Sequence, residues 1–383
     1  MTNMNPGSTA NMQIEDELSE DPQALDRGSL SYRQLVWRRF RKSKLAIIGA
    51  GILIALYSLS LFADFFAPYS YITDNMLNRY VPPTHVHVYD TKAGNLRWPF
   101  VYGLKSTRDR ETMELSFTED TTKTYPVTLF HRGDSYRMLG IVSSNLHLIG
   151  SDGPFYIAGT DRMGRDLFSR ILFGGRVSLT IGLVGVFLSI LLGSLLGILS
   201  GYRGGWLDVA IQRIIELLSA FPAIPLWMSL AAALPAGWSG LQVYFAITVI
   251  LSLLGWGGLA RQVRGKVLST RDADYVMAAR AAGASHWYVI TRHLAPTAYS
   301  HIIIIATLSI PGMILGETAL SFLGLGIRPP MTSWGVLLQD AQRVTVVLHY
   351  PWLLISSLPV VIVVIAFNFV GDALRDAADP YSN

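Results

Sequence analysis

None of the residue patterns in this sequence indicates covalent, metal or nucleotide chemistry. The chain has no cysteine, which excludes a disulfide, a thiolate metal site and a Cys nucleophile. It has no Gly-x-x-x-x-Gly-Lys-[Ser/Thr] phosphate loop, so it does not hold ATP phosphates by that device. Its apolar stretches contain no aspartate pair, Ser–His pair or His-Glu-x-x-His zinc motif. We therefore predict that the chain is not an enzyme and holds no cofactor or metal of its own.

Two glutamates lie within long apolar stretches and are the ionisable groups that could act inside a membrane. We expect both to be buried and to face a cavity or a partner, because a charge in hydrocarbon is costly. Glu317 either lines a passage or braces the backbone around Gly316 and Gly324 by hydrogen bonds. The candidate residues for a pathway or an interface are Glu216, Pro222, Glu317 and Ser321.

A second charged cluster stands just before one of the apolar stretches. It consists of Asp161, Arg162, Arg165 and Asp166, within the run from Gly159. Mutual ion pairing in this cluster would fix the helix that begins there. Contact with a solute is the alternative, and the sequence leaves both open.

The polar segment Asp272–Thr297, between two apolar stretches, predicts two short helices with a break between them. Asp272 and Asp274 can begin the first helix by capping and by attraction to the helix dipole. The alanine-rich residues that follow have high helix propensity. Gly283 can then adopt the left-handed conformation that ends a helix.

The second short helix of this segment begins at Ser285, which can cap it, and Pro296 is expected to end it. Small side chains around the break would let another backbone approach closely; they are Ala278, Ala279, Ala281, Ala282 and Ala284. Apolar side chains that could enter a groove are Met277, Trp287, Tyr288, Val289 and Ile290. Docking on another protein and packing on its own chain are both open.

Composition places these residues in a membrane protein. Of 383 residues, 51% are hydrophobic and only 15% are charged, whereas soluble domains have about 25% charged residues. About 20 apolar residues cross the hydrocarbon core as a helix. We predict an all-α membrane fold with six transmembrane helices, the third interrupted by Pro222 and Pro225. Their approximate bounds are Lys44–Phe66, Val177–Gly201, Val209–Leu234, Val243–Ala260, His301–Leu325 and Pro351–Gly371.

Lys and Arg residues in the short connections predict the orientation. They gather from Arg27 to Lys44 and from Arg261 to Arg292, whereas the opposite connections carry only Arg328 and Arg343. Both termini are therefore predicted to be cytoplasmic. The acidic residues 1–30 lack the apolar core of a signal peptide and predict a flexible tail. The net charge of +4 is too small to indicate nucleic-acid binding.

The basic segment from Tyr32 to Ser43 is amphipathic and could lie on anionic membrane lipid before the first span. After that span, the residues from Pro68 to Ala158 are predicted to form a small β-rich insert on the outer side. If this insert has a function of its own, that function is contact with an extracytoplasmic partner. Alternation predicts strands at 86–89, 114–118 and 125–130, with Pro126 on an edge strand. The insert contains His85, His87, His131 and His147, which are surface histidines or, less simply, metal ligands.

The segment after Asp272 resembles a known family. Ala278-Ala279-x-x-x-Gly283, with Pro296 after it, resembles the EAA loop of ATP-binding-cassette (ABC) importer permeases. Met277 stands where that family has Glu, and His293 where it has a hydrophobic residue. In the family this loop forms the coupling helix received by the ATPase. The resemblance implies that the coupling residues are Asp274, Tyr275, Met277, Ala278, Ala279, Arg280, Ala282, Gly283, Ala284 and Ser285.

Three further stretches resemble the second, C-type permease of the oligopeptide/dipeptide/nickel branch. They are Gly159 to Leu179, Glu317 to Gly335 and Phe369 to Asp376. The enlarged outer insert departs from the minimal pattern of the branch. The division implied is a tail (1–30), an amphipathic segment with the first span (31–66), a periplasmic insert (67–158), a permease core (159–376) containing the coupling loop (261–300), and a tail (377–383).

This resemblance implies a binding-protein-dependent importer in the bacterial inner membrane, of which the chain forms half of the pathway. Two ATPase subunits would bind ATP and Mg, a non-identical second permease would complete the pathway, and a periplasmic binding protein would deliver the solute. Peptides or peptide-like solutes are implied, and the branch also carries oligosaccharides, opines and nickel chelates. An ion-coupled secondary transporter is the alternative class, but we find no inverted repeat of the kind it would need.

Overall fold

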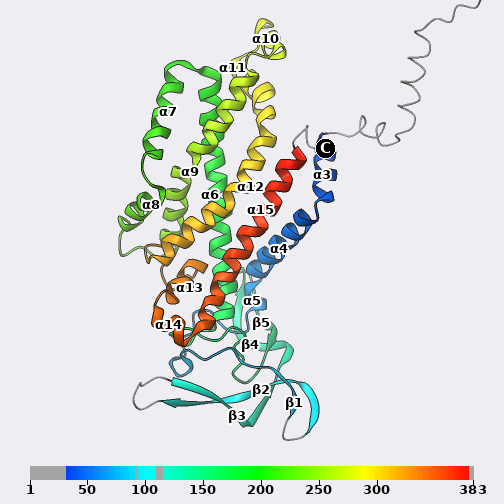
Figure 1. Cartoon of the computed structure of the whole chain (residues 1–383), viewed down its shortest axis with the longest axis vertical. Helices are drawn as coiled ribbons and strands as arrows, with labels where there is room; N and C mark the ends of the chain where they lie inside the picture. The colour runs from blue at the N-terminus through cyan, green and yellow to red at the C-terminus, as the bar shows by residue number, and fades with distance from the viewer. Residues whose placement is uncertain (1–31, 91–93, 109–114, 379–383) are drawn as a thin grey trace, which may run out of the picture.

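A computed structural model describes residues 32–90, 94–108 and 115–378 as a bundle of long helices with β-strands at one end (Figure 1). The predicted tail 1–30 and most of 377–383 lie outside the described residues. The longer helices are α3 (Tyr32–Lys42), α4 (Lys44–Leu61), α6 (Leu167–Arg203), α7 (Gly205–Ser219), α8 (Ala223–Ala232), α9 (Gly240–Thr270), α12 (Ala295–Phe322) and α15 (Leu358–Ala378). The short ones are α5 (Ala63–Phe66), η1 (Met76–Asn78), α10 (Asp274–Ala281), α11 (His286–Val289), the π-helical η2 (Ile290–Leu294), α13 (Trp334–Asp340), α14 (Val344–His349) and the 3-10 helix η3 (Pro351–Ser357).

Five of the described helical segments are long and apolar enough to cross a membrane. They are Lys44–Leu61, Leu167–Arg203, Gly240–Thr270, His286–Phe322 and Pro351–Ala378. Helices α7 and α8 make a sixth only if both count as one span, because they are bent by 84°. Pro222 precedes α8 at this break, in an extended conformation that an α-helix does not contain. The predicted count of six spans therefore holds only with a broken third span.

Pro296 does not end the second short helix, contrary to the prediction. Helix α11 continues through η2 into α12, and Pro296 lies in the first turn of α12. A proline clashes with the carbonyl four residues earlier in a regular helix, and the wider π turn relieves this clash. The fifth span is therefore longer than predicted, and it is continuous with the polar loop.

Helices α6 and α9 pack closely along a row of glycines spaced four residues apart. A Cβ atom added at Gly193, Gly197 or Gly201 would lie 2.9, 2.6 or 2.9 Å from a carbonyl oxygen of α9. Hydrogen bonds add to this contact: Ser189 Oγ donates to the carbonyl of Ser252, and Ser252 Oγ donates to the carbonyl of Gly185. Small residues at such an interface let two backbones approach in the membrane.

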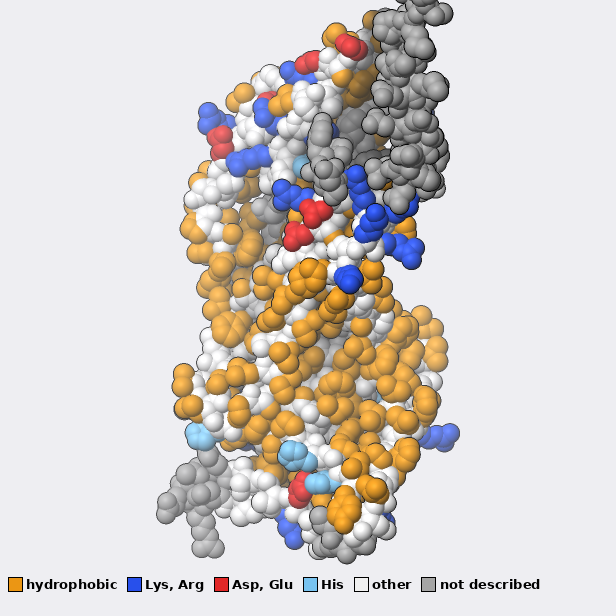
Figure 2. Space-filling view, turned by 45° about the vertical axis from the view of Figure 1, so that its right-hand side comes forward, with side chains coloured by type: hydrophobic (Ala, Val, Ile, Leu, Met, Phe, Trp, Pro, Cys, Tyr) orange, Lys and Arg blue, Asp and Glu red, His pale blue; other side chains and the backbone are white. Residues whose placement is uncertain are grey.

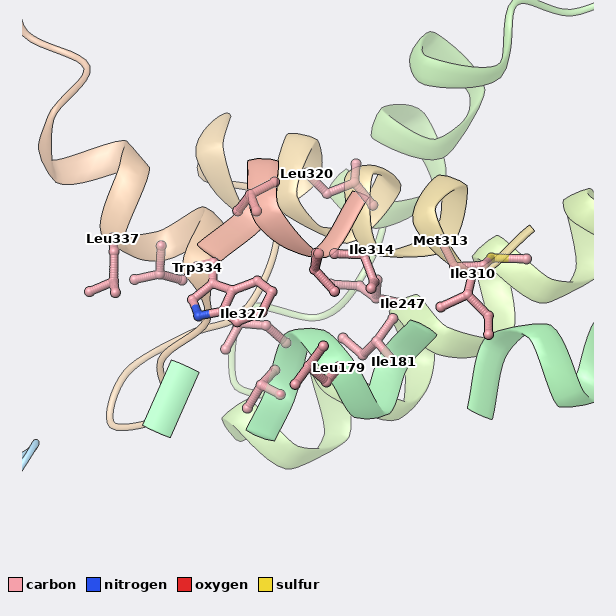
Figure 3. Packing of buried hydrophobic residues seen from close by; sticks show 14 of the residues in the cluster. Leu179, Ile181, Ile247, Ile310, Met313, Ile314, Leu320, Ile327, Trp334 and Leu337 are labelled. Atoms are coloured by element: carbon pink, nitrogen blue, oxygen red, sulfur yellow. The ribbon is translucent and has the colours of Figure 1, made fainter. Parts of the chain in front are cut away.

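The largest hydrophobic core lies where α6, α9, α12 and α13 meet. Figure 3 shows side chains of these elements packed together, among them Ile181 of α6, Ile247 of α9, Ile314 of α12 and Trp334 of α13. Trp334 is buried, and its indole N–H donates to the carbonyl of Ile171 at 3.0 Å. Helix α13, which the sequence did not predict, is thus held inside the bundle.

Two separate antiparallel sheets form the β-rich part. One has the order β1 (His87–Asp90), β2 (Asn95–Arg108) and β3 (Leu115–Pro126); the other pairs β4 (Thr128–Met138) with β5 (Val142–Gly150). The predicted strands 86–89 and 114–118 fall on β1 and β3, apart from Val86, which precedes β1, and Glu114, which is outside the described residues. The predicted strand 125–130 is divided between the end of β3 and the start of β4, because the chain passes from one sheet to the other at the buried Val127. Pro126 does end β3, an edge strand.

The surface and the ends of the bundle agree with a membrane location. A broad band of hydrophobic side chains covers the middle of the face in Figure 2, with Lys and Arg gathered above it. The basic helix α3, the end of α15 and the loop helix α10 all lie at the end of the bundle opposite the β-strands (Figure 1). The segments predicted to share one side of the membrane therefore lie at one end of the molecule.

Candidate coupling loop and buried polar clusters

The first loop helix, α10, begins at Asp274, but neither predicted aspartate caps it. The N-cap residue is Ala273, whose side chain has no hydrogen-bonding atom. Asp272 instead pairs with Arg271, whose Nε lies 3.1 Å from its Oδ2. Asp274 lies in the first turn, where its charge favours the positive end of the helix dipole.

The break after α10 has the predicted geometry. Gly283 has a φ of +83°, a left-handed conformation that costs a residue with a Cβ about 1–2 kcal/mol. Ser285 caps α11, its Oγ accepting from the backbone N–H of Tyr288 at 3.3 Å. The two helices are therefore separated by residues 282–285, which contain the left-handed Gly283 and end at the cap of α11.

The loop presents small and aromatic side chains to its surroundings. Tyr275, Met277, Trp287 and Tyr288 are exposed, and so are three alanines before Gly283, namely Ala278, Ala281 and Ala282. Ala279 and Ala284 are half-buried. The prediction was wrong for Val289 and Ile290, which are buried against α6 and α9 side chains such as Tyr202 and Val263. The exposed surface therefore comes from α10 and the first turn of α11.

Tyr202, near the end of α6, contacts both loop helices and was not singled out from the sequence. Its hydroxyl lies 2.7 Å from Nδ1 of His286 in α11, and the guanidinium of Arg280 in α10 lies 5.0 Å from its ring centroid. The ring is buried. The sequence shows a tyrosine at the end of an apolar span, which could have marked it as a candidate contact residue. Its partners could not be inferred, because they lie about 80 residues later in the chain.

Ionic and backbone contacts fix the membrane helices at this same end. Arg264 of α9 donates from Nε and Nη2 to the two carboxylate oxygens of Asp208 in α7, at 2.7 and 2.6 Å. Arg271 donates to the carbonyl of Gly201 at 3.2 Å. Two parallel hydrogen bonds between Arg and carboxylate hold a defined geometry. These contacts therefore hold α6, α7 and α9 together next to the coupling loop.

Glu317 is fully buried and is a hydrogen-bond hub between α6, α12 and α13. Its two carboxylate oxygens accept from Ser321 Oγ at 2.6 Å and from Ser178 Oγ at 2.8 Å. The same hydroxyls accept backbone N–H groups of Ile327 and Trp334. Of the two interpretations of Glu317, this geometry agrees with bracing, and Ser321 belongs to the same network.

In the charged cluster before α6, only some of the predicted ion pairs join two members of the cluster. Arg165 Nε donates to Asp161 Oδ2 at 2.8 Å, and Asp161 also pairs with Arg170, a buried residue of α6 outside the predicted set. Arg162 reaches away to Asp340 of α13, with Nε 3.2 Å from Oδ1. Arg170 pairs with Asp340 as well, so the cluster joins the loop before α6 to α13. Arg170 lies before the predicted second span, so the apolar pattern did not single it out.

Asp166 takes no part in these ion pairs and caps α6 instead. Its Oδ2 accepts from the backbone N–H of Ser169 at 2.7 Å, while its Oδ1 is buried with no hydrogen-bond partner among the described residues. Burial raises the pKa of Asp166 to about 6, although the bonds to Ser169 oppose the rise. The carboxyl is therefore close to its midpoint at mildly acidic pH.

Glu216 is exposed in the isolated chain, contrary to the prediction that it is buried. It pairs with Arg213 one turn earlier in α7, at 2.7 Å between Nη1 and Oε2. Pro222 is exposed as well and marks the break before α8. Neither residue contacts the network around Glu317 in the described part of the chain.

Comparison with known proteins identifies a family of membrane transport proteins. Two protein-family models match the chain. The family of inner membrane components of binding-protein-dependent transport systems matches residues 193–381. The family of N-terminal membrane domains of oligopeptide transport permease C matches residues 31–83. The dipeptide permease DppC of Lactococcus lactis is 32% identical, over 94% of both chains. The oligopeptide permease OppC of Bacillus subtilis is 30% identical, over 94% of this chain and 93% of the relative. The OppC of Haemophilus influenzae is 40% identical over 59% of this chain and 70% of its own length. The chain therefore belongs to the family of binding-protein-dependent transport permeases, in the branch of oligopeptide and dipeptide permeases of the C type.

Proposed function

We propose that this chain forms half of the translocation pathway of a peptide importer in the bacterial inner membrane. A second, non-identical permease completes the pathway, and two ATPase subunits bind ATP and Mg. The names of its relatives, which include dipeptide, oligopeptide and glutathione permeases, support peptides or peptide-like solutes. Both termini and the coupling loop 261–300 face the cytoplasm, because Lys and Arg gather at that end.

The observation that carries this proposal is the pair of loop helices that meet at Gly283. A short helix with exposed alanines and aromatic residues can enter a groove of another protein. The residues proposed to contact the ATPase are Asp274, Tyr275, Met277, Ala278, Ala279, Arg280, Ala282, Gly283, Ala284 and Ser285. Tyr202 then transmits movement of this loop to α6, since it contacts a residue on each side of the glycine.

Movement of the loop would rock the spans between inward- and outward-facing states, a rigid-body change of a common kind. The braces within the chain support this mechanism. Glu317 holds α6, α12 and α13 together, and Arg264 with Asp208 holds α7 to α9. The pair Arg213–Glu216 and the break at Pro222 are exposed in this chain, and they face the second permease or the pathway. The insert 67–158 lies at the opposite end, where the binding protein docks.

Reconstitution tests this function directly. The chain, its partner permease and both ATPase subunits are placed in proteoliposomes, and uptake of labelled peptide is measured with the purified binding protein and ATP. We expect uptake that needs every component. Uptake by this chain alone, driven by an ion gradient, would contradict the proposal and favour the secondary transporter.

A further inference from the structure

A small polar pocket opens at the end of the bundle opposite the coupling loop. Its volume is about 170 Å³. Three segments meet there: the loop before β1, the loop before α6, and α13 with the turn after it, which Figure 1 places near the β-strands. The polar residues that line it are Tyr80, Arg162, Gln339, Asp340, Gln342 and Arg343.

The lining of this pocket is rich in hydrogen-bond donors and positive in charge. Its one carboxylate, Asp340, is already held by Arg162 at 3.2 Å and by Arg170 at 3.3 Å. Arg343 has no ion-pair partner within the described part of the chain, and it is exposed. Two arginines against one aspartate leave a net positive lining, and the two glutamine amides can donate as well. Such a set of donors is suited to a carboxylate.

The wall made by Tyr80 is held in an unusual conformation. Its φ is 56°, a left-handed value that is uncommon for a residue with a large side chain. The ring stacks on Tyr350 with centroids 3.9 Å apart, and the backbone N–H donates to the carbonyl of Asp161 at 3.1 Å. Burial raises the pKa of Tyr80 above its ordinary value. Surrounding contacts therefore fix this wall and cover the cost of its backbone strain.

The size of the pocket limits what it can accept. Pockets for small-molecule ligands have volumes of about 300–1,000 Å³, so about 170 Å³ is too small for a peptide solute. One carboxylate side chain carried by a larger partner fits this space. The pocket lies at the end where the proposed function places the binding protein, and the exposed Arg343 is open to a partner that arrives there.

We propose that this pocket receives an Asp or Glu side chain of the extracytoplasmic solute-binding protein, with Arg343 and Arg162 as its ionic partners. The inference rests on the proposed function and adds a docking contact to it. Because Arg162 also holds Asp340, the incoming carboxylate competes with α13 for this arginine. Docking is thereby linked to Arg170, and so to the start of α6.

The test measures how tightly the purified binding protein associates with the assembled complex in nanodiscs. We expect Arg343→Glu to weaken this association about tenfold or more, and Arg343→Gln to weaken it less, with stronger effects at low salt. The matched control is Arg137→Glu in β4, an exposed arginine of the outer end that does not line the pocket. Unchanged basal ATPase activity shows that the variants have assembled.

Three outcomes would overturn the inference. Equal weakening by Arg137→Glu would show general charge steering instead of a specific contact. Weakening only when the binding protein carries peptide would assign the pocket to the solute carboxylate. Unchanged affinity in both Arg343 variants would mean that no docking contact exists there. If the wild-type complex binds no such protein at all, the proposed function itself fails, which is a distinguishable result.

Discussion

The hydroxyl of Tyr202 lies 2.7 Å from Nδ1 of His286, and Arg280 lies over the ring of the same tyrosine. One buried side chain of α6 thus contacts both loop helices across Gly283. The hydroxyl contacts His286 and the ring contacts Arg280, so the two contacts can be tested separately.

Tyr202→Phe removes only the hydrogen bond, with a net free energy of about 1 kcal/mol, while Tyr202→Ala also removes the cation–π contact. We expect the ATPase subunits to stay bound in both variants. The number of ATP molecules hydrolysed per peptide imported should rise, and more for Ala than for Phe. Tyr299→Phe, at an exposed position of α12, is the control. An unchanged ratio in Tyr202→Ala would show that Tyr202 does not transmit movement.

Gly283→Val should reduce uptake about tenfold or more while membrane insertion stays normal. No atom of this chain lies within 4 Å of a Cβ placed there, so the strain within the chain comes from the left-handed backbone. That strain is about 1–2 kcal/mol for a residue with a Cβ. Gly283→Asn is the matched control, because Asn tolerates this conformation. Equal uptake by the Val variant and the wild type would contradict a role for this bend.

Gly197→Ala should lower the melting temperature of the purified chain. Its Cβ would lie 2.6 Å from the carbonyl oxygen of Ala260, and overpacking of this kind costs about 1–3 kcal/mol. Gly258→Ala in α9 meets nothing within 4 Å and should keep or slightly raise the melting temperature. Identical melting temperatures for the two variants would mean that α6 and α9 are not closely packed there.

Glu317→Gln should destabilise the chain modestly and Glu317→Leu strongly. The Ser178 and Ser321 hydroxyls each donate to Glu317 while accepting a backbone N–H, so Leu leaves both protons without acceptors. An unsatisfied buried donor costs about 1–3 kcal/mol. Thermal unfolding in detergent measures the loss. A changed KM for uptake with unchanged stability would instead show that Glu317 lines the pathway.

The stability of the chain should fall as pH rises through the range in which Asp166 loses its proton. Its folded pKa of about 6 lies above the ordinary value of 3.8, so the folded state binds more protons between these values. The free energy of unfolding should therefore drop by about 1 kcal/mol from pH 5 to pH 7 through this group. Asp166→Asn keeps a good N-cap and should lack this part of the pH dependence. Parallel pH profiles for the two proteins would contradict the shift.

Much of the membrane fold could be read from the sequence, because long apolar runs and charged connections are local properties. The same is true of the break at Gly283 and the cap at Ser285, since a left-handed glycine and a serine cap depend on adjacent residues. The prediction failed where a local pattern was ambiguous. The apolar residues around Val127 read as a strand, and Pro296 read as an end, although a π turn carries the helix past it.

Which charged and polar groups meet was decided only by the tertiary structure. Three contacts join residues that are far apart in the sequence. Arg170 contacts Asp340, 170 residues later; Ser178 contacts Glu317, 139 residues later; and Tyr202 contacts His286, 84 residues later. No periodicity links such distant residues, since their pairing depends on how whole helices pack. Burial also makes these contacts specific, because an unpaired polar group inside the bundle is costly. The sequence determined most of the long helices and the bend of the coupling loop, and the packing of α6 against α12 and α13 determined the polar network.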